Sequence, residues 1–187
     1  MALLHPPGAQ PFDYYLMSSE EELGRLFNFD YWLAYNTGFT QKAFNRTFSS
    51  RGREQHRHEF VHMLYPAVKN YFLAEGLATY LGGVDGHTPY RETLRAVALD
   101  LQRHPGVTFE DLYTSKFRYP TNANPRYVAA GLVYELVAQR AGVGAFQQLE
   151  ESENTYASFL QHFAALLRLP PPRAEALLNQ QLRAAAR

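Results

Sequence analysis

The chain contains no cysteine, so disulfide bonds and catalysis by a thiol are both excluded. It also has no net charge, because 18 lysine and arginine residues balance 18 aspartate and glutamate residues. The basic residues are dispersed, and we therefore expect neither nucleic acid nor an anionic membrane surface as a partner. The segment Met1 to Pro11 lacks a basic start and an apolar run, so no signal peptide or membrane span is visible. Two interpretations stay open: a cytosolic protein, or a mature segment whose export signal was removed.

The residues that are present suit an ordinary folded domain. Hydrophobic residues make up 46% of the 187 positions, and tyrosine and phenylalanine occur thirteen times each. This length and composition can supply the core of one domain, or of one compact two-lobed unit. We expect a single domain over residues 1–187.

The most informative motif is His58-Glu59-Phe60-Val61-His62. Two histidines four positions apart project from the same side of an α-helix, so both imidazoles can reach one metal ion. At about 100° per residue, Glu59 falls in the same sector of that helix. Its carboxylate can therefore address a water molecule at the metal. The motif predicts a metal-dependent hydrolase site.

A second helical pattern runs from Tyr71 to Leu81, with Asn70 as a plausible N-cap and Gly82-Gly83 as a stop signal. Apolar residues cover most of its circumference and leave Glu75 and Thr79 in one narrow polar arc, which predicts a largely buried helix. An unpaired buried carboxylate is expensive, and a divalent cation is a good partner for it. Glu75 is therefore the predicted third ligand, and a solvated or salt-bridged glutamate is the alternative.

The ligand types favour Zn²⁺ in a catalytic site. Three protein ligands leave one position for water, whereas structural zinc prefers four protein ligands, and this chain has no cysteine to offer. The other candidate histidines, His56, His87 and His104, are weaker. His56 lies ~160° from His58 around the helix, which argues against its joining the metal.

With His58 to His62 followed by Glu75-Gly76-Leu77-Ala78-Thr79-Tyr80, the chain resembles the gluzincin branch of the MA-type zinc metallopeptidases, whose helices carry His-Glu-x-x-His and then Glu-Gly-x-Ala-x-Tyr. The resemblance implies that His58, His62 and Glu75 bind zinc and that Glu59 is the general base. Thermolysin-like members have an aspartate where this chain has Thr79, so it looks more like the aminopeptidase-like branch. The twelve residues between His62 and Glu75 are a shorter gap than in the best-known members.

The resemblance also implies a fold. We expect an α+β, mainly helical, zincin-like structure, with a small sheet and the zinc helix in residues 1–66, a helical lobe in residues 67–187, and a cleft between them. In gluzincins an edge strand of the sheet pairs with extended substrate, and Ala43 to Ser49 is the expected edge, with a plain core strand as the alternative. Related enzymes steady the oxyanion with a tyrosine from a later helix. Tyr127 is the candidate, with Tyr134 and Tyr119 behind it, and packing is the alternative role.

Local patterns predict the remaining elements. A strand is expected from Phe12 to Met17, then a helix capped by Ser18 or Ser19 that runs to about Phe27, then strand-like aromatics from Tyr31 to Ser50 with a break at Gly38. Pro170-Pro171-Pro172 is expected to be a linker before the last helix. The predicted later helices are Tyr90 to Arg103, Phe109 to Tyr113, Pro125 to Ala141, Gly144 to Glu151, Tyr156 to Leu169 and Arg173 to Ala186.

The expected function is zinc-assisted hydrolysis of a peptide bond in a peptide or protein substrate. Glu59 would take the proton of the attacking water and deliver it to the leaving amine. The resemblance also implies an exported enzyme, since such family members are often exported by bacteria, with a cytoplasmic one as the alternative. A second hypothesis is a gluzincin-like domain that keeps the metal but serves as a binding or regulatory module of a larger protein.

Overall fold

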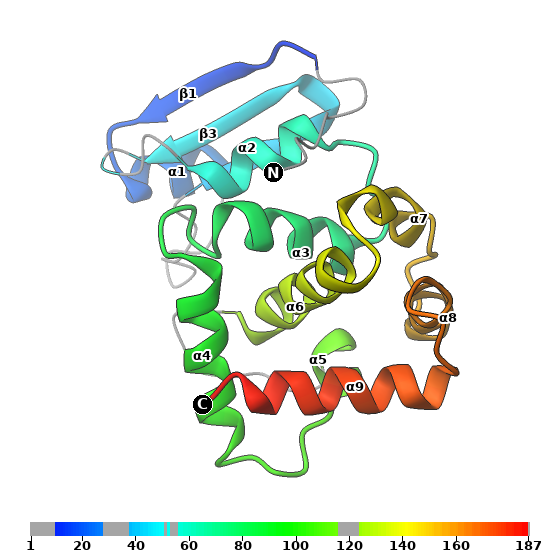
Figure 1. Cartoon of the computed structure of the whole chain (residues 1–187). Helices are drawn as coiled ribbons and strands as arrows, with labels where there is room; N and C mark the ends of the chain where they lie inside the picture. Colours follow the sequence, from blue (N-terminus) through cyan, green and yellow to red (C-terminus); the bar gives the residue numbers. More distant parts are fainter. Residues whose placement is uncertain (1–9, 28–37, 51, 53–55, 116–123, 187) are drawn as a thin grey trace.

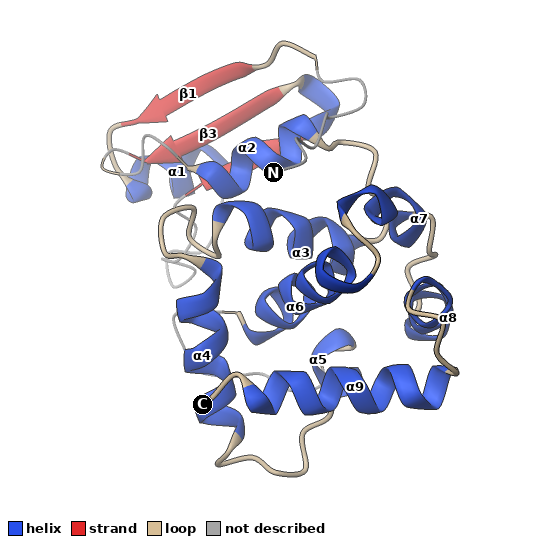
Figure 2. Ribbon diagram, viewed as in Figure 1, coloured by secondary structure: helices blue, strands red, loops and turns tan. Residues whose placement is uncertain are grey.

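The computed structural model describes residues 10–27, 38–50, 52, 56–115 and 124–186. Over these residues the chain is α+β and mainly helical, as the sequence predicts. Figure 1 shows a small sheet with helix α2 lying against it, and the other helices from α3 onward gathered on the far side of α2. Every described strand precedes α2 in the chain, and the described elements after it are helical. Figure 2 shows the strands gathered at one end of the molecule, apart from most of the helices.

The sheet has three described strands, β1 (Asp13–Met17), β2 (Gly38–Gln41) and β3 (Arg46–Ser50), in the order β1-β3-β2. β1 runs parallel to β3, and β2 runs antiparallel to it. The expectation that Ala43 to Ser49 forms an edge strand is therefore wrong. Its first residues lie in a 3-10 helix, η2 (Lys42–Phe44), and the rest lie in the central strand. The reason is the distant β1, which pairs with β3 along the side opposite to β2.

The first predicted helix is confirmed as α1 (Glu20–Phe27). It begins where Ser19 accepts a hydrogen bond from the backbone N–H of Glu22 at 3.1 Å. Leu23, on its inner side, is fully buried. A short amphipathic helix of this kind is held by its buried face more than by its own propensity, and here it covers part of the sheet next to β1 and β3.

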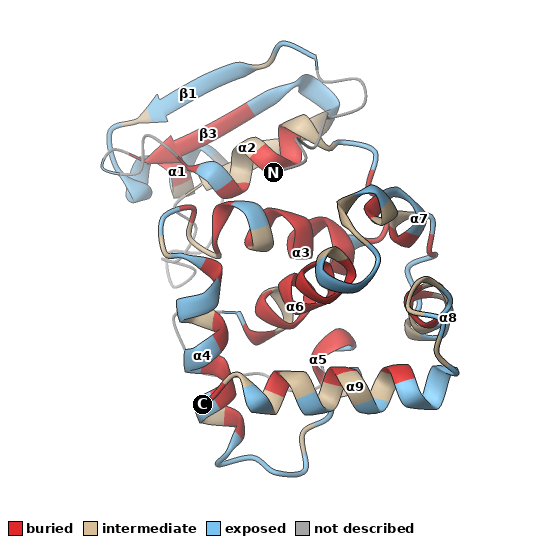
Figure 3. Ribbon diagram, in the orientation of Figure 1, coloured by how far each residue is buried: buried red, intermediate tan, exposed pale blue. Residues whose placement is uncertain are grey.

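Two helices carry the motifs singled out from the sequence, α2 (Arg57–Leu64) and α3 (Tyr71–Gly82). α3 begins after Asn70, whose side chain accepts a hydrogen bond from the Leu73 N–H, and it ends at Gly83. Gly83 has φ +82°, in the left-handed region that glycine adopts at little cost. α3 is buried along nearly its whole length, as its sequence predicts (Figure 3). It packs on α2 on one side and on α6 on another.

The core lies around α3 and α6 (Pro125–Arg140), both of which are mostly buried in Figure 3. Around Phe72 of α3, the rings of Phe109, Tyr113 and Phe159 stack or meet edge to face with centroids 4.5 to 6.0 Å apart. The surrounding elements are α4 (Tyr90–Leu101), α5 (Phe109–Tyr113), η3 (Val143–Ala145), α7 (Phe146–Glu150), α8 (Tyr156–Leu166) and α9 (Pro171–Ala184).

The expected proline linker is wrong in its boundaries. Pro171 and Pro172 form the first turn of α9, and Pro170 precedes it as the N-cap. Proline is tolerated there because the first N–H groups of a helix have no partner within it, and its fixed φ suits the helix. Among the described helices, none is both long and apolar enough to cross a membrane.

Candidate metal centre

The three predicted metal ligands meet where α2 crosses α3. His58 and His62 lie one turn apart on α2, and Glu75 faces them from the second turn of α3. The Nε2 atom of His58 is 3.1 Å from Oε2 of Glu75, and Nε2 of His62 is 3.5 Å from Oε1. All three side chains are buried. Residues far apart in the sequence thus bring two imidazoles and one carboxylate to a single point.

The spacing of these donor atoms suits one small cation. The three ligand atoms lie within 4.8 Å of one another. Zinc binds imidazole nitrogen and carboxylate oxygen at about 2.0–2.2 Å in tetrahedral geometry, which places neighbouring donors about 3.4 Å apart. The two separations from Glu75, 3.1 and 3.5 Å, bracket that value. The group can therefore hold a metal ion without large movement.

A backbone contact fixes the orientation of His58. Its Nδ1 donates a hydrogen bond of 2.8 Å to the carbonyl oxygen of Gly83, at the end of α3. In the neutral ring this leaves the lone pair on Nε2, the atom that faces Glu75. The left-handed turn that ends α3 therefore also sets the histidine tautomer that a metal requires.

Without a metal, the same atoms form a charged hydrogen-bonded pair. Burial by itself would raise the pKa of Glu75, but hydrogen bonds and charges from His58 and His62 outweigh it and lower that pKa to about 2. Burial alone would lower the pKa of His58, but its contacts with Glu75, Glu59 and the Gly83 carbonyl raise it. The raised pKa of His58 favours its protonated form in the metal-free protein, and metal binding would release a proton held there.

Glu59 is also in α2, on a side that faces the sheet. Its Oε2 accepts a hydrogen bond of 2.6 Å from the hydroxyl of Thr40 on β2. Glu59 is only half-buried, whereas the histidines on either side of it are buried. A carboxylate that is reachable and adjacent to the metal group is what a general base at this site requires.

Tyr127 lies at the start of α6 beside the same group. Its ring is nearly parallel to the ring of His58, with centroids 6.1 Å apart, and its hydroxyl is 2.7 Å from the hydroxyl of Tyr71 on α3. Burial, reinforced by the negative charge of Glu75, raises the pKa of Tyr127 well above its ordinary value. Tyr127 is therefore a neutral hydrogen-bond donor at physiological pH.

Of the two alternative candidate tyrosines, Tyr134 is the one that lies within the described residues. Tyr134 is fully buried in α6, and its hydroxyl donates a 3.1 Å hydrogen bond to Glu150 of α7. Tyr119 lies outside the described residues. Tyr71 was missed by the sequence reasoning, although it stands four residues before Glu75 and so on the same side of α3. That spacing was the signal that could have identified it.

The other histidines stay outside the group. His56 is the N-cap residue of α2, and its ring centroid is 6.4 Å from that of His58. Burial lowers the pKa of His56 to about 4, so it is neutral at physiological pH. His87 and His104 are exposed.

Lys42 of η2 is a further residue that the sequence did not identify. Burial lowers the pKa of Lys42, and the charges of Glu75 and Glu59 counteract that shift.

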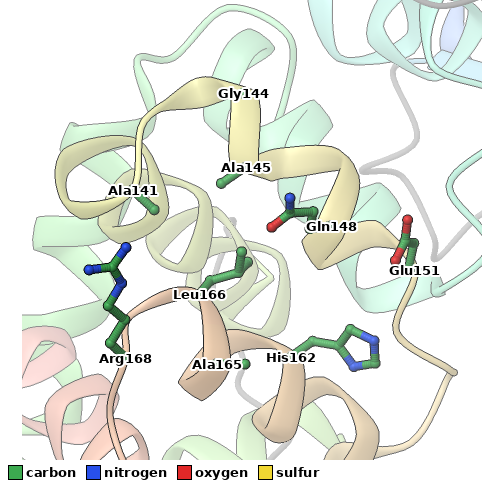
Figure 4. Close-up of a pocket in the computed structure, with 9 residues that line it drawn as sticks. All are labelled: Ala141, Gly144, Ala145, Gln148, Glu151, His162, Ala165, Leu166 and Arg168. Carbon is green, nitrogen blue, oxygen red and sulfur yellow. The ribbon is translucent and has the colours of Figure 1, made fainter.

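A separate groove lies between the end of α6 and helices α7 and α8 (Figure 4). Polar side chains of Gln148, Glu151, His162 and Arg168 line it together with small residues. None of the predicted ligands takes part in it, so this groove and the candidate metal centre are distinct.

The chain matches no protein-family model. Likewise, neither a curated protein nor a solved structure shows significant similarity to it. The functional argument therefore rests on the residues of this chain and their geometry.

Proposed function

We propose that this chain is a zinc-dependent peptidase that hydrolyses peptide bonds in peptide or protein substrates. One observation carries the proposal: His58, His62 and Glu75 present their donor atoms to one another within 4.8 Å, and the half-buried Glu59 lies between the two histidines in the same helix. This combination of a three-ligand group with an adjacent carboxylate that is not one of the ligands suits hydrolysis better than a purely structural metal site.

The ligand chemistry favours zinc over harder cations. Imidazole nitrogen suits zinc, whereas calcium and magnesium prefer sites made entirely of oxygen. When bound, zinc lowers the pKa of water toward about 7 and polarises a carbonyl group. His58 and His62 supply neutral nitrogen donors, and Glu75 supplies one negative charge that offsets part of the charge of the cation.

The protein residues then move one proton. Glu59 accepts it from the water that attacks the scissile carbonyl, and Glu59 returns it to the amine that leaves. In this role Glu59 must keep a free oxygen toward the reacting atoms. The Thr40 hydroxyl engages Oε2, so Oε1 remains for the transfer.

Tyr127 stabilises the negative charge that develops on the carbonyl oxygen. Its raised pKa keeps the phenol protonated, and stacking on His58 holds the ring beside the metal ligands. In the substrate-free protein the two hydroxyls of Tyr127 and Tyr71 bond to each other. During the reaction the Tyr127 hydroxyl turns from Tyr71 to the oxyanion.

The sheet supports a substrate in extended conformation. β2 is next to α2, and in the described part of the chain it pairs only with β3, so its outer edge can accept a peptide as an added strand. A small sheet followed by two helices that carry His-Glu-x-x-His and the downstream glutamate agrees with the gluzincin resemblance. This agreement supports our proposal that the fold is zincin-like.

The decisive experiment is hydrolysis of a quenched-fluorescent peptide library by the zinc-loaded protein, with and without a chelator. The control is Glu59→Gln, which keeps the shape of the side chain but cannot accept the proton. It should retain zinc and melting temperature while activity falls at least ~10²-fold. Hydrolysis that survives both the chelator and the substitution would refute the proposal. Stoichiometric zinc without any hydrolysis would instead favour the binding or regulatory module.

A further inference from the structure

One face of β2 is directed at Glu59. Side chains alternate along a strand, so Gly38 and Thr40 lie on the same face. A Cβ atom at Gly38 would come within 2.6 Å of Cγ of Glu59, and the hydroxyl of Thr40 is 2.6 Å from Oε2 of Glu59. β2 therefore touches both the aliphatic part and the carboxylate of this side chain.

Thr40 is itself held from the central strand. It is paired directly with Thr47 of β3 in the antiparallel register, and the two hydroxyl oxygens are 3.1 Å apart. Thr47 is fully buried. Directly opposed threonines are a stabilising cross-strand pair, and here the pair also limits the rotation of the Thr40 side chain.

Counting protons gives the direction of these hydrogen bonds. Each hydroxyl has one proton, and an ionised carboxylate only accepts. The short contact with Glu59 therefore uses the proton of Thr40, and Thr40 can then only accept from Thr47. Among the described residues, the Thr47 hydroxyl has one other hydrogen-bond contact, a longer one of 3.4 Å to the carbonyl of Phe39. The hydroxyls of Thr47 and Thr40 thus form a chain that ends on Oε2 of Glu59.

We propose that Thr40 is a positioning residue for the general base, a role that rests on the proposed hydrolase function. Glutamate has three rotatable bonds, and a free carboxylate would sample several orientations. The Thr40 hydroxyl holds Oε2 toward the sheet, and the absence of a side chain at Gly38 leaves the space beside β2 that the Glu59 side chain occupies. Oε1 is then kept on the side of the reacting atoms, and the orientation is set before substrate binds.

The test compares Thr40→Val, which keeps the shape but removes the hydroxyl, with Thr40→Ser, which keeps the hydroxyl. In zinc-loaded protein, Thr40→Val should lower kcat ~10- to 10²-fold with KM little changed, and Thr40→Ser should restore most of it. Zinc content should be unchanged in both, and any fall in melting temperature should be small, because the cross-strand pair contributes little by itself. In a Glu59→Gln background, Thr40→Val should cause no further loss, because the hydroxyl acts through Glu59. Thr114→Val, in the turn after α5, is the control for loss of a hydroxyl elsewhere.

A second measurement does not depend on activity. Crystal structures should show the Glu59 carboxylate displaced in Thr40→Val and in place in Thr40→Ser. An unmoved carboxylate, or full activity of Thr40→Val beside an active wild type, would overturn the role of Thr40 and leave the proposed function intact. Zinc loss with a melting temperature several degrees lower in Thr40→Val would also overturn it, since Thr40 would then be structural. Absence of hydrolysis by the zinc-loaded wild type would instead refute the proposed function.

Discussion

Replacing Glu75 by glutamine tests the charge at the centre of the site without requiring any substrate. Glutamine keeps the size of the side chain but removes the negative charge that pairs with His58 and His62. In the metal-free protein, this negative charge offsets the free-energy cost of holding two buried imidazoles close to each other. We therefore expect Glu75→Gln to destabilise the metal-free protein.

The magnitude follows from the pKa of Glu75, which its surroundings lower from 4.5 to about 2. At about 1.4 kcal/mol per pKa unit, the ionised form contributes about 3 kcal/mol to the free energy of unfolding. Because the pKa is lowered by folding, this contribution is present above pH 4.5 and is lost as the pH falls from 4.5 toward 2. The pKa of His58 is raised, so its contribution is present below about pH 6.5 and is lost as the pH rises through the raised value. The pair is therefore strongest between about pH 4.5 and 6.5.

Urea unfolding of chelator-treated wild type and Glu75→Gln from pH 3 to pH 8 measures this difference. We expect a gap of about 3 kcal/mol near pH 5.5 that narrows toward both ends of the range. Titration of His56 is common to both proteins and cancels in the comparison. Glu92→Gln, an exposed charge on α4, is the control and should change stability by less than about 0.5 kcal/mol. A constant gap across the range, or no gap at pH 5.5, would refute the pairing.

Three further predictions concern the ligand set, the oxyanion and acid stability. Wild-type protein should contain near-stoichiometric zinc by elemental analysis, and His62→Ala should lose most of it; equal zinc in both would end the ligand assignment. Tyr127→Phe should keep zinc and melting temperature but lower kcat by ~10- to 10³-fold, whereas normal kcat with a lower melting temperature would make Tyr127 a structural partner of Tyr71. Burial lowers the pKa of His56 to about 4, so the free energy of unfolding should decrease as the pH falls from about 6.5 to about 4. Urea unfolding should show a smaller decrease for His56→Gln over this range. A decrease equal to that of the wild type would contradict the role of the buried His56.

Features encoded by neighbouring residues could be predicted from the sequence. The start and end of α3 follow from Asn70 and Gly83, and the one-turn spacing of His58 and His62 follows from helix geometry. The crossing of α2 and α3 that brings Glu75 to both histidines was predicted only through the motif pair, since no local rule gives the angle between two helices. The expectation of a three-ligand metal site is what places Glu75 beside both histidines.

Features that depend on distant pairing could not be predicted. The edge strand was misplaced because β1 pairs with β3 from more than twenty residues away, and strand order leaves no local trace. Thr40 could not be identified for the same reason, because its proposed role depends on its hydrogen-bond contacts with Thr47 and with Glu59. The linker prediction for Pro171 is wrong because proline, which breaks the interior of a helix, is favoured in the first turn.

Asn70 has a larger role in the structure than its N-cap position in the sequence indicates. Its sequence role is the N-cap of α3, and loss of a cap costs about 1 kcal/mol. In the structure Asn70 is fully buried, and its Nδ2 is 2.8 Å from the carbonyl of Glu153 and 3.3 Å from the hydroxyls of Tyr113 and Ser152. Removing it would take this donor from the two buried hydroxyls and from the partly buried Glu153 carbonyl, at about 1–3 kcal/mol more.

Asn70→Ala should therefore lower the free energy of unfolding by about 3 kcal/mol in urea denaturation, and Asn70→Ser, which keeps only a cap, should recover about 1 kcal/mol of it. The matched control is Asn124→Ala at the exposed N-cap of α6. Within the described part of the chain its side chain accepts from the Arg126 N–H alone, and the cost should stay near 1 kcal/mol. Equal losses in Asn70→Ala and Asn124→Ala would mean that the buried amide contributes nothing beyond the cap.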